Sequence, residues 1–600
     1  MNKSALIDKI KELEGLSNDE KSALLGLLRS HKKYGLVWED KPEDVEERLK
    51  DSLPVLTEVK ERAIISDSPD APNHILIEGD NLEALTALSY THEGKVDVIY
   101  IDPPYNTGNK DFTYNDTRVD AEDSYRHSKW LSFMEKRLRI AKRLLSDRGV
   151  IFISIDDNEQ ANLKLLCDEI FGENKFVGNI IWYKKRKGSF LSNKLVSLTE
   201  YVLPYYGGQI VPLFGGKPDN SESQPIIKRT NAIKELRFPA NVVKTKLDDG
   251  VYPCGLYGVG TSATTVKSEV HVKSGLIINE FVLEAPFTWS QEFLNAEIAN
   301  GTEVLINTNK FQVRVIRRNN DSIKAFPSFV DGREIGGTNE DAYECLKDIF
   351  NTDRPFPYSK PANFIKTIIN SVLYNRPDAY VLDFFAGSGT TLQSLLQLNS
   401  EDGGCRKCII VTNNEEDICE TVTYVRSERI IKGYNNVKGE RVNGFTNNSL
   451  RYYRTSLLSR ERTMPNMRKL VSLATDMLCI KEDLYKEEFT FGKLKLNPQI
   501  ARYFNDGKHQ MLVIYREEVI RYFVDEIEKM SFDGKLKVYL FAPDRYAFDD
   551  DFFGVSDKVQ LCALPAAIYD AYQKVLPKHK PRYVEIEEVE TEDKEDSTMF

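Results

Sequence analysis

The feature of this sequence that most constrains its fold is a repeated alternation of short apolar runs with amphipathic helical stretches. Between residues 74 and 171, the runs HILIEGDN, VDVIYI and GVIFISID are separated by segments with helical periodicity. The alternation returns between 361 and 431, where AYVLDFFAG and CIIVTNN each follow a helical segment. Such alternation is typical of a doubly wound, mostly parallel α/β sheet, which binds ligands at the carboxyl ends of its strands. The sequence therefore predicts one α/β core in two pieces.

The segment between the two pieces has a different character. It is rich in Gly, Pro, Asn and Thr and contains short alternating stretches such as KFQVRVIRR, which predict an inserted mixed α/β or β-rich domain. We divide the chain into five regions: an N-terminal helical region (1–60), the first core piece (61–184), the insert (185–355), the second core piece (356–436) and a C-terminal α+β domain with an acidic tail (437–600).

Composition favours a soluble globular enzyme of several domains. The 600 residues are 41% hydrophobic and 29% charged, and the longest apolar runs have strand length, far short of the ~20 residues that span a bilayer. The N-terminus has no apolar segment typical of a secretory signal, so we expect a cytoplasmic protein. The eight cysteines are scattered, and Cys405 and Cys408 form a CxxC without the second pair that a zinc site needs. We therefore predict no metal site and place Cys408 in a buried strand.

The charge distribution leaves room for a nucleic-acid partner. The net charge is −11, but residues 583–600 carry −7 of it, and residues 181–240 carry +6. The basic segment begins with Lys184, Lys185, Arg186 and Lys187. These four side chains are candidate contacts to DNA phosphates. A solvated surface turn is the alternative.

The first candidate catalytic motif is Asp102-Pro103-Pro104-Tyr105, which directly follows VDVIYI at a predicted strand end. It suits methylation of an exocyclic amine, whose lone pair is delocalised into the ring. The Asp102 carboxylate and the Pro103 carbonyl can accept both N–H bonds of that amine, because each proline fixes its φ at about −65° and so aims the backbone. Tyr105 offers a flat face on which an extruded base can stack. The competing interpretation is a proline-stiffened turn.

The second motif is DFFAGSGTT at 383–391, again a strand, a glycine turn and a helix. Gly387 and Gly389 let a ligand approach the backbone, and the following helix N-terminus supplies free N–H groups. Because Thr390 follows Gly389, the motif is neither a dinucleotide fingerprint nor a P-loop. Asp383 suits a ligand with an ammonium group, as in S-adenosylmethionine. Plain strand–helix packing is the alternative.

Two further carboxylates follow predicted strands. Asp80 in EGDNL and Glu415 in VTNNE could reach the adenine and the ribose hydroxyls of a nucleoside cofactor. Each could instead cap the following helix. Asn413 and Asn414 share the turn with Glu415, so which of these three residues meets the ribose stays open.

The two motifs, in this order and with a long insert between them, resemble the β group of amino-DNA methyltransferases. Within that group the chain is similar to the modification (Mod) subunit of Type III restriction–modification systems. The matching stretches cover about 74–182 and 355–434, under a third of the chain, and include GDNLEAL, VIYIDPPYNTG, FPYSKP, DFFAGSGTT and VTNNEEDICETVTYVRSERI. The resemblance implies a Rossmann-like methyltransferase core with permuted motif order, and it makes 185–355 the target-recognition domain.

The resemblance also implies a reaction and the residues that perform it. It implies that the chain transfers a methyl group from S-adenosylmethionine to the N6 amino group of adenine in double-stranded DNA, with the target base flipped out of the duplex. Adenine N6 is favoured over cytosine N4 because residue 102 is Asp rather than Ser. The catalytic residues become Asp102, Pro103 and Tyr105, with Pro104 as scaffold. The implied cofactor contacts are Asp80, Asp383, Phe385, Ala386, Gly387, Gly389, Thr390 and Glu415.

The implied partners are a second copy of the chain in a homodimer and a separate ATP-dependent restriction subunit, a helicase and nuclease. The sequence itself contains no Walker A motif and no DEAD-like helicase string. The alternatives are a standalone amino-methyltransferase, a non-catalytic DNA-specificity module, and a methyltransferase of RNA or small molecules. Intact Asp102 and an unbroken GSGTT argue against the non-catalytic module.

Overall fold

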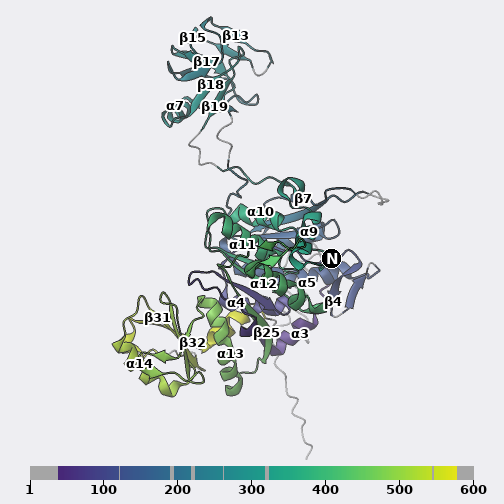
Figure 1. Ribbon diagram of the computed structural model, residues 1–600, viewed down its shortest axis with the longest axis vertical. Coiled ribbons are helices and arrows are strands. Elements are labelled where there is room, and N and C mark those ends of the chain that lie inside the picture. The colour runs from purple at the N-terminus through teal and green to yellow at the C-terminus, as the bar shows by residue number, and fades with distance from the viewer. Residues whose placement is uncertain are drawn as a thin grey trace, which may run out of the picture. The chain divides into compact units, whose positions relative to one another are not determined.

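A computed structural model describes residues 38–576, with short gaps at 116, 121, 189–194, 218–222, 261–262, 318–322, 354, 544–545 and 547. The chain divides into two compact units, one of Met1–Pro212 with Pro327–Phe600 and one of Leu213–Phe326 (Figure 1). Most of the expected N-terminal helical region (residues 1–37) and the acidic tail lie outside the described residues.

The larger unit is built on a ten-stranded sheet with the order β1-β25-β2-β22-β21-β3-β6-β8-β7-β20. Five consecutive pairs, from β25–β2 to β3–β6, are parallel, which confirms the predicted doubly wound core. Antiparallel pairs flank them at β1–β25, β6–β8 and β8–β7. The strands are β1 (Ser52–Glu58), β25 (Ser449–Ser459), β2 (Asn73–Glu78), β22 (Lys407–Thr412), β21 (Tyr380–Asp383), β3 (Val96–Ile101), β6 (Leu145–Ile155), β8 (Thr199–Tyr206), β7 (Ile180–Tyr183) and β20 (Phe329–Asp331).

Strands from the two core pieces interleave in this sheet. β22 and β21, from the second piece, lie between β2 and β3, from the first. Val381 of β21 pairs with Val98 of β3, and Leu382 pairs with Ile99. β21 therefore ends beside the end of β3, which brings the two motifs together at one edge of the sheet.

Helices cover both faces of the central strands. Ile99 and Ile101 of β3 belong to a buried core that includes side chains of α4, α5 and α6. Successive strand residues face opposite sides, so the buried Val98 and Tyr100 face the other layer, where α10 contacts β3 and packs on α11 (Figure 1). These helices confirm the predicted segments; they are α4 (Asn81–Thr91), α5 (Arg126–Leu144), α6 (Gln160–Phe171), α10 (Ala362–Leu373), α11 (Thr390–Asp402) and α12 (Tyr424–Lys432).

The outer regions of the chain add to the same sheet. Residues 52–58 were expected to be helical but form β1, because Pro54 disfavours a helix interior and is tolerated in an edge strand. Within the described part of that region the helix is α3 (Asp44–Asp51). β25 starts beyond 437 yet pairs with β2, while α13 (Met464–Glu482) and α15 (Ala566–Gln573) pack on α4. The region from 437 onward therefore completes the core as well as forming a sheet of its own.

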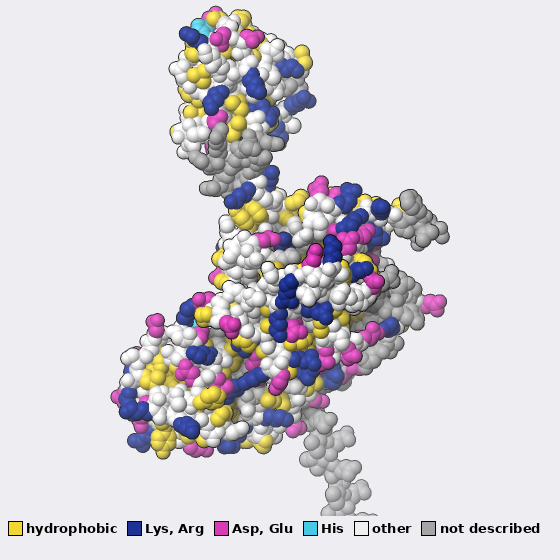
Figure 2. Space-filling model, viewed as in Figure 1, with side chains coloured by type: hydrophobic (Ala, Val, Ile, Leu, Met, Phe, Trp, Pro, Cys, Tyr) yellow, Lys and Arg dark blue, Asp and Glu magenta, His cyan; other side chains and the backbone are white. Residues whose placement is uncertain are grey.

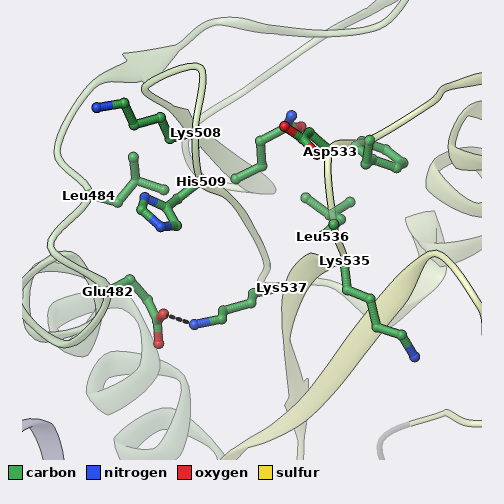
Figure 3. A pocket seen from close by; sticks show the side chains of 11 residues that line it. Glu482, Leu484, Lys508, His509, Asp533, Lys535, Leu536 and Lys537 are labelled. Atoms are coloured by element: carbon green, nitrogen blue, oxygen red, sulfur yellow. Dashed lines mark hydrogen bonds and ion pairs between the residues drawn. The ribbon is translucent and has the colours of Figure 1, made fainter.

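That second sheet has the order β26-β29-β30-β31-β32. Its elements are β26 (Glu487–Glu488), β29 (Ala501–Asn505), β30 (Gln510–Ile514), β31 (Leu536–Ala542), β32 (Val559–Pro565) and α14 (Ile520–Lys529). A cavity of about 190 Å³ lies here, with Glu482, Lys508, His509 and Lys537 among its lining residues, and Glu482 and Lys537 form an ion pair (Figure 3). None of its lining residues belongs to either motif.

The smaller unit is rich in β-structure, as the sequence of the insert suggests. One sheet has the order β10-β17-β14-β13 and the other β12-β15-β16-β11-β18-β19-β9, and they enclose a core that includes Phe238, Phe281 and Phe287. Its elements are β9 (Gln224–Pro225), β10 (Lys234–Phe238), β11 (Val243–Thr245), β12 (Gly250–Tyr252), β13 (Gly255–Tyr257), β14 (Thr264–Val266), β15 (Val270–Lys273), β16 (Leu276–Ile277), β17 (Phe281–Ala285), α7 (Gln291–Ala299), β18 (Glu303–Ile306) and β19 (Val313–Ile316).

The remaining part of the expected insert belongs to the larger unit. It contains β8, β20 and the helices α8 (Gly332–Ile335) and α9 (Asn339–Phe350). Short two-stranded ladders complete the described structure: β4 (Asn109–Tyr114) with β5 (Thr117–Asp120), β23 (Tyr434–Asn435) with β24 (Arg441–Val442), and β27 (Thr490–Phe491) with β28 (Leu494–Lys495). On the visible faces of both units, Lys and Arg side chains are interspersed with Asp and Glu (Figure 2).

Candidate active site

The Asp102–Tyr105 loop leaves the carboxyl end of β3 and is held by contacts to α5 and to Glu159, the N-cap residue of α6. The indole Nε1 of Trp130 donates to the Pro104 carbonyl at 2.7 Å. Asn106 is buried with φ +54°, a left-handed conformation that Asn tolerates, and its Nδ2 donates to Glu159 at 2.5 Å. Within the described residues, no donor reaches the carbonyl of Pro103. The loop is therefore held in place, while the Pro103 carbonyl can still accept a hydrogen bond from a ligand.

The Asp102 side chain belongs to a partly buried polar cluster of five residues, which we call the carboxylate cluster: Asp102, Tyr105, Lys184, Glu200 and Lys360. Lys360 Nζ lies 2.9 Å from Asp102 Oδ1 and 3.2 Å from Glu200 Oε2, and it donates to the Tyr105 hydroxyl at 2.7 Å. The Tyr105 hydroxyl lies 2.9 Å from Asp102 Oδ1 and 3.1 Å from Glu200 Oε2. Lys184 Nζ donates to Glu200 Oε1 at 2.7 Å.

The ionisation of these groups is set by burial and by their neighbours. Burial raises the pKa of Asp102, Lys360 counteracts it, and the nearby Glu200 adds to the rise. Burial also acts to raise the pKa of Glu200, but Lys360 and Lys184 together hold that pKa below its usual value. Burial acts to lower the pKa of Lys360, and its two carboxylate partners more than reverse that effect. Two carboxylates and two ammonium groups thus balance one another in a space with little water.

The glycine turn of the second motif lies at the end of the neighbouring strand β21. Gly387 has φ +48° and Gly389 has φ +79°, left-handed values that favour glycine. Asp383 accepts from the backbone N–H of Phe385 at 3.0 Å and from the Thr391 hydroxyl at 2.5 Å. Burial raises the pKa of Asp383 to about 7. The carboxyl group is therefore poised to ionise when a cationic group arrives.

Phe385, Ala386 and Thr390 have defined places around this turn. The Phe385 ring packs 5.8 Å from that of Phe133, the Ala386 N–H donates to the Val411 carbonyl at 3.0 Å, and the Thr390 hydroxyl accepts from Arg426 at 2.7 Å. A Cβ built on Gly387 would meet nothing nearer than Phe356 at 3.7 Å. There is space beside the turn at this glycine.

Arg426 is a buried cation that sequence analysis did not single out. Its Nη1 donates to the hydroxyls of Ser359, Ser388 and Thr390, at 3.3, 2.8 and 2.7 Å, and its Nε and Nη2 donate to Gln393. Among the described residues it has no carboxylate partner, and burial lowers its pKa. A buried charge is costly unless paired, so a site behind these three hydroxyls favours an anionic ligand group.

Asp80 and Glu415 lie where the sequence places them, after β2 and β22. Asp80 is the N-cap of α4: its Oδ1 accepts from the Leu82 N–H at 2.7 Å, while its Oδ2 lies 3.8 Å from Arg137. Glu415 is exposed at the start of a short 3₁₀ turn, and the neighbouring Asn414 accepts from the Glu420 N–H at 3.1 Å. Asp80 therefore has a structural role whether or not it also meets a ligand.

The four basic residues at 184–187 separate into two kinds. Lys184 lies in the carboxylate cluster, and Arg186 forms ion pairs with Asp341 and Glu344. Lys185 is half-buried, Lys187 is exposed, and neither has an ion pair among the described residues. The structure thus brings one of the four to the edge with Asp102 and leaves two side chains open to solvent or to a partner.

The described part of the chain contains no group of three or more His, Cys, Asp or Glu side chains placed to hold a metal ion. Cys408 is buried on β22, as predicted, and Cys405 is exposed. No described helix is both long and apolar enough to cross a bilayer.

Comparison with known proteins agrees with this geometry. The model of the DNA methylase family N6_N4_Mtase matches residues 96–423, a range that contains both motifs. The chain is 34% identical over 362 residues to the Type II methyltransferase M.KpnI of Klebsiella pneumoniae, covering 58% of this chain and 82% of that enzyme.

Two Type III restriction–modification Mod subunits are also similar. Identity to the EcoP15I Mod subunit of Escherichia coli is 30% over 467 residues, covering 68% of each chain. Identity to the StyLTI Mod subunit of Salmonella typhimurium is 33% over 391 residues, covering 60% of this chain and 55% of that subunit. The match therefore spans just over half of the length of the Salmonella subunit.

Proposed function

This chain belongs to the DNA methylase family, and on that premise we propose that it methylates the N6 amino group of adenine in double-stranded DNA, taking the methyl group from S-adenosylmethionine. The observation that carries the proposal is the juxtaposition of two strand ends. The Asp102 carboxylate and the open Pro103 carbonyl leave β3 beside the glycine turn that leaves β21. The site for the amine that receives the methyl group and the site for the cofactor are therefore adjacent.

The chemistry asked of Asp102 and Pro103 is positioning and electrostatic stabilisation. The target nitrogen gains positive charge as its lone pair attacks, and two oxygen acceptors on its hydrogens favour that charge. Because Trp130 occupies the Pro104 carbonyl, the Pro103 carbonyl is the backbone acceptor left for the amine. A base inside a duplex cannot reach this edge, so the target must be flipped out of the stack, and the Tyr105 ring offers a stacking surface.

The residues around the glycine turn fit the proposed cofactor. S-adenosylmethionine carries an ammonium group and a carboxylate on its amino-acid end, and when bound it supplies an activated methyl group. Asp383 provides a buried carboxyl for the ammonium, and the hydroxyls backed by the uncompensated charge of Arg426 suit the carboxylate. Phe385 and Gly387 line the turn between them, and we propose Ala386, Gly389, Thr390, Asp80 and Glu415 as further contacts.

We propose further that the chain is the modification and specificity subunit of a Type III system. The relatives named Mod subunits support this, as does the presence of a compact β-rich unit between the two core pieces, which we propose reads the target sequence. A homodimer and a separate restriction subunit follow from the same proposal. A standalone methyltransferase is the second candidate, and the similarity to the Type II enzyme M.KpnI favours it.

Position-resolved sequencing of methylated bases, in DNA from cells that express this chain alone, tests the proposal. The expected result is N6-methyladenine at a single recurring sequence. N4-methylcytosine at such a sequence would overturn the adenine assignment, and unmethylated DNA from cells with folded protein would overturn the enzymatic one. Methylation of one strand of an asymmetric site would favour a Type III subunit, and methylation of both strands of a palindrome a Type II enzyme.

The pKa of Asp383 makes a prediction about cofactor binding. Below about pH 7 the empty site holds a proton on Asp383, and an ammonium group prefers the carboxylate form. Binding must then release this proton, so calorimetry should find that affinity for S-adenosylmethionine rises by up to about tenfold per pH unit and levels off above pH 7. Asp383→Asn should bind weakly without this dependence. A pH-independent affinity in the unsubstituted chain would contradict the assignment.

The basic residues give a second prediction. Lys185→Gln with Lys187→Gln should weaken binding to every DNA sequence alike and lower the log–log salt slope by about 0.9 per lost phosphate contact. Methylation should drop at moderate salt and partly recover at low salt, with the target sequence unchanged. Lys184→Gln is the contrasting variant, because Lys184 binds Glu200, and its rate loss should persist at low salt. Unaltered salt dependence in the double variant would mean that Lys185 and Lys187 belong to a solvated turn.

A further inference from the structure

Lys360 occupies the centre of the carboxylate cluster, yet neither motif contains it. Its ammonium has three N–H bonds, and three acceptors surround it: Asp102 Oδ1, the Tyr105 hydroxyl and Glu200 Oε2. The side chain is only 12% exposed. It also lies 4.8 Å from the Tyr105 ring centroid and 5.7 Å from that of Trp182. The ammonium is therefore held in one place, with each of its hydrogens engaged.

The two oxygens of Asp102 consequently differ. The hydrogen bond from Tyr105 and the ion pair with Lys360 both reach Oδ1. Among the described residues no donor reaches Oδ2, although the side chain is 22% exposed. We propose, on the basis of the proposed function, that Lys360 is a positioning residue for methyl transfer: it anchors Oδ1 of Asp102 in its charged form and leaves Oδ2 to accept a hydrogen of the target amine.

The electrostatics of the cluster give this role a physical reason. Asp102 is largely buried and stands near a second carboxylate, and both effects favour its protonated form. A protonated Asp102 would not stabilise the positive charge that develops on the amine, and a proton on Oδ2 would make that oxygen a donor instead of an acceptor. Lys360 is the cation that opposes these effects, so its loss would raise the pKa of Asp102 further.

Glu200 completes the arrangement. An ammonium group beside the target would repel the positive charge that develops on the amine. Glu200 binds Lys360 and Lys184 together and balances their charge with that of Asp102. The net electrostatic field at the target nitrogen then comes chiefly from the nearest oxygen atoms, those of Asp102 and Pro103. Lys360 lies just before α10, so this contact also joins the cofactor half of the core to the catalytic half.

Lys360→Met is the direct test, with Lys366→Met on α10 as the matched control, because Lys366 pairs with Glu401 outside the cluster. In single-turnover methyl transfer at neutral pH, Lys360→Met should lose about 10²-fold in rate, the scale expected for one misplaced electrostatic group. The loss should shrink as pH rises, because a carboxyl with a higher pKa ionises at a higher pH. Cofactor affinity should stay within a few fold of the unsubstituted chain, and the control should keep the normal profile.

Two further variants separate positioning from mere folding. Lys360→Arg keeps the positive charge. It should therefore have a reduced rate but the same fall in rate at acid pH (the acid limb of the pH–rate profile) as the unsubstituted chain. Glu200→Gln added to Lys360→Met removes the second carboxylate and should move the acid limb back toward its normal position. A loss in Lys360→Met that is equal at every pH, or a parallel loss of cofactor affinity, would overturn the proposed role.

Melting temperature against pH gives a readout that does not need activity. A folded-state carboxyl with a raised pKa binds its proton more tightly than the unfolded chain does, so stability falls as pH rises through that pKa. Lys360→Met should therefore lose progressively more stability, relative to Lys366→Met, as pH rises from 4, near the pKa of the unfolded carboxyl, to 8. An equal loss of stability at low and high pH would contradict the role of Lys360, whichever reaction the protein catalyses. Failure of the proposed function would show separately, in the methylated base that the unsubstituted chain makes.

Discussion

Asp102→Ala is expected to lower methyl transfer by at least about 10³-fold while cofactor affinity stays within a few fold. The reason is that Asp102 leaves β3 toward the target amine, whereas the cofactor groups surround the turn after β21. The measurement pairs single-turnover rates with calorimetry of S-adenosylmethionine binding. Asp157→Ala is the matched control, an exposed carboxylate after β6 whose partner is the Tyr201 hydroxyl.

The control variant should keep both the rate and the affinity of the unsubstituted chain. If Asp102→Ala instead lost cofactor affinity by the same factor as rate, Asp102 would belong to the cofactor site. That outcome would remove the division of roles between the two strand ends.

Replacing Gly387 by leucine is expected to abolish cofactor binding. The residue has φ +48°, so any side chain is strained there, and the space into which its Cβ would point is the space beside the turn that the cofactor needs. Gly403→Leu is the matched control, because Gly403 has φ +73° with no atom within 4 Å of its added Cβ. Both variants bear the backbone strain, but only Gly387→Leu should lose binding in calorimetry.

Normal affinity in Gly387→Leu would place the cofactor elsewhere than beside this turn. Equal loss in both variants would instead trace the effect to stability, and thermal melting in the absence of cofactor would reveal it.

The core of the fold could be predicted because its signals are local. Apolar runs of strand length and helical periodicity lie within single segments, and the structure confirms them at β2, β3, β6, β21 and β22. The order of these strands, with β21 beside β3, is a long-range property that periodicity does not contain. β1 was missed for a related reason: its strand character comes from pairing with β25, far along the chain.

The residues of the candidate site could likewise be predicted only where their signal lies within one segment of the sequence. Asp102 and Asp383 were found because each lies at the carboxyl end of a strand within one motif. Lys360 and Glu200 were not, although FPYSKP stood out as a matching stretch, because their chemistry arises from contacts between residues 95 or more positions apart in sequence. Arg426 was missed because an arginine on an amphipathic helix is ordinarily exposed, and only the packing of α12 buries it.

Mass spectrometry of nucleosides from a duplex methylated in vitro tests the central claim most directly. The purified chain, S-adenosylmethionine and DNA that contains the recognised sequence would be incubated, digested to nucleosides and compared with the same reaction using Asp102→Ala. We expect N6-methyldeoxyadenosine from the unsubstituted chain and none above background from the variant. N4-methyldeoxycytidine as the product, or equal N6-methyldeoxyadenosine from both proteins, would contradict the assignment of Asp102 to an adenine amine.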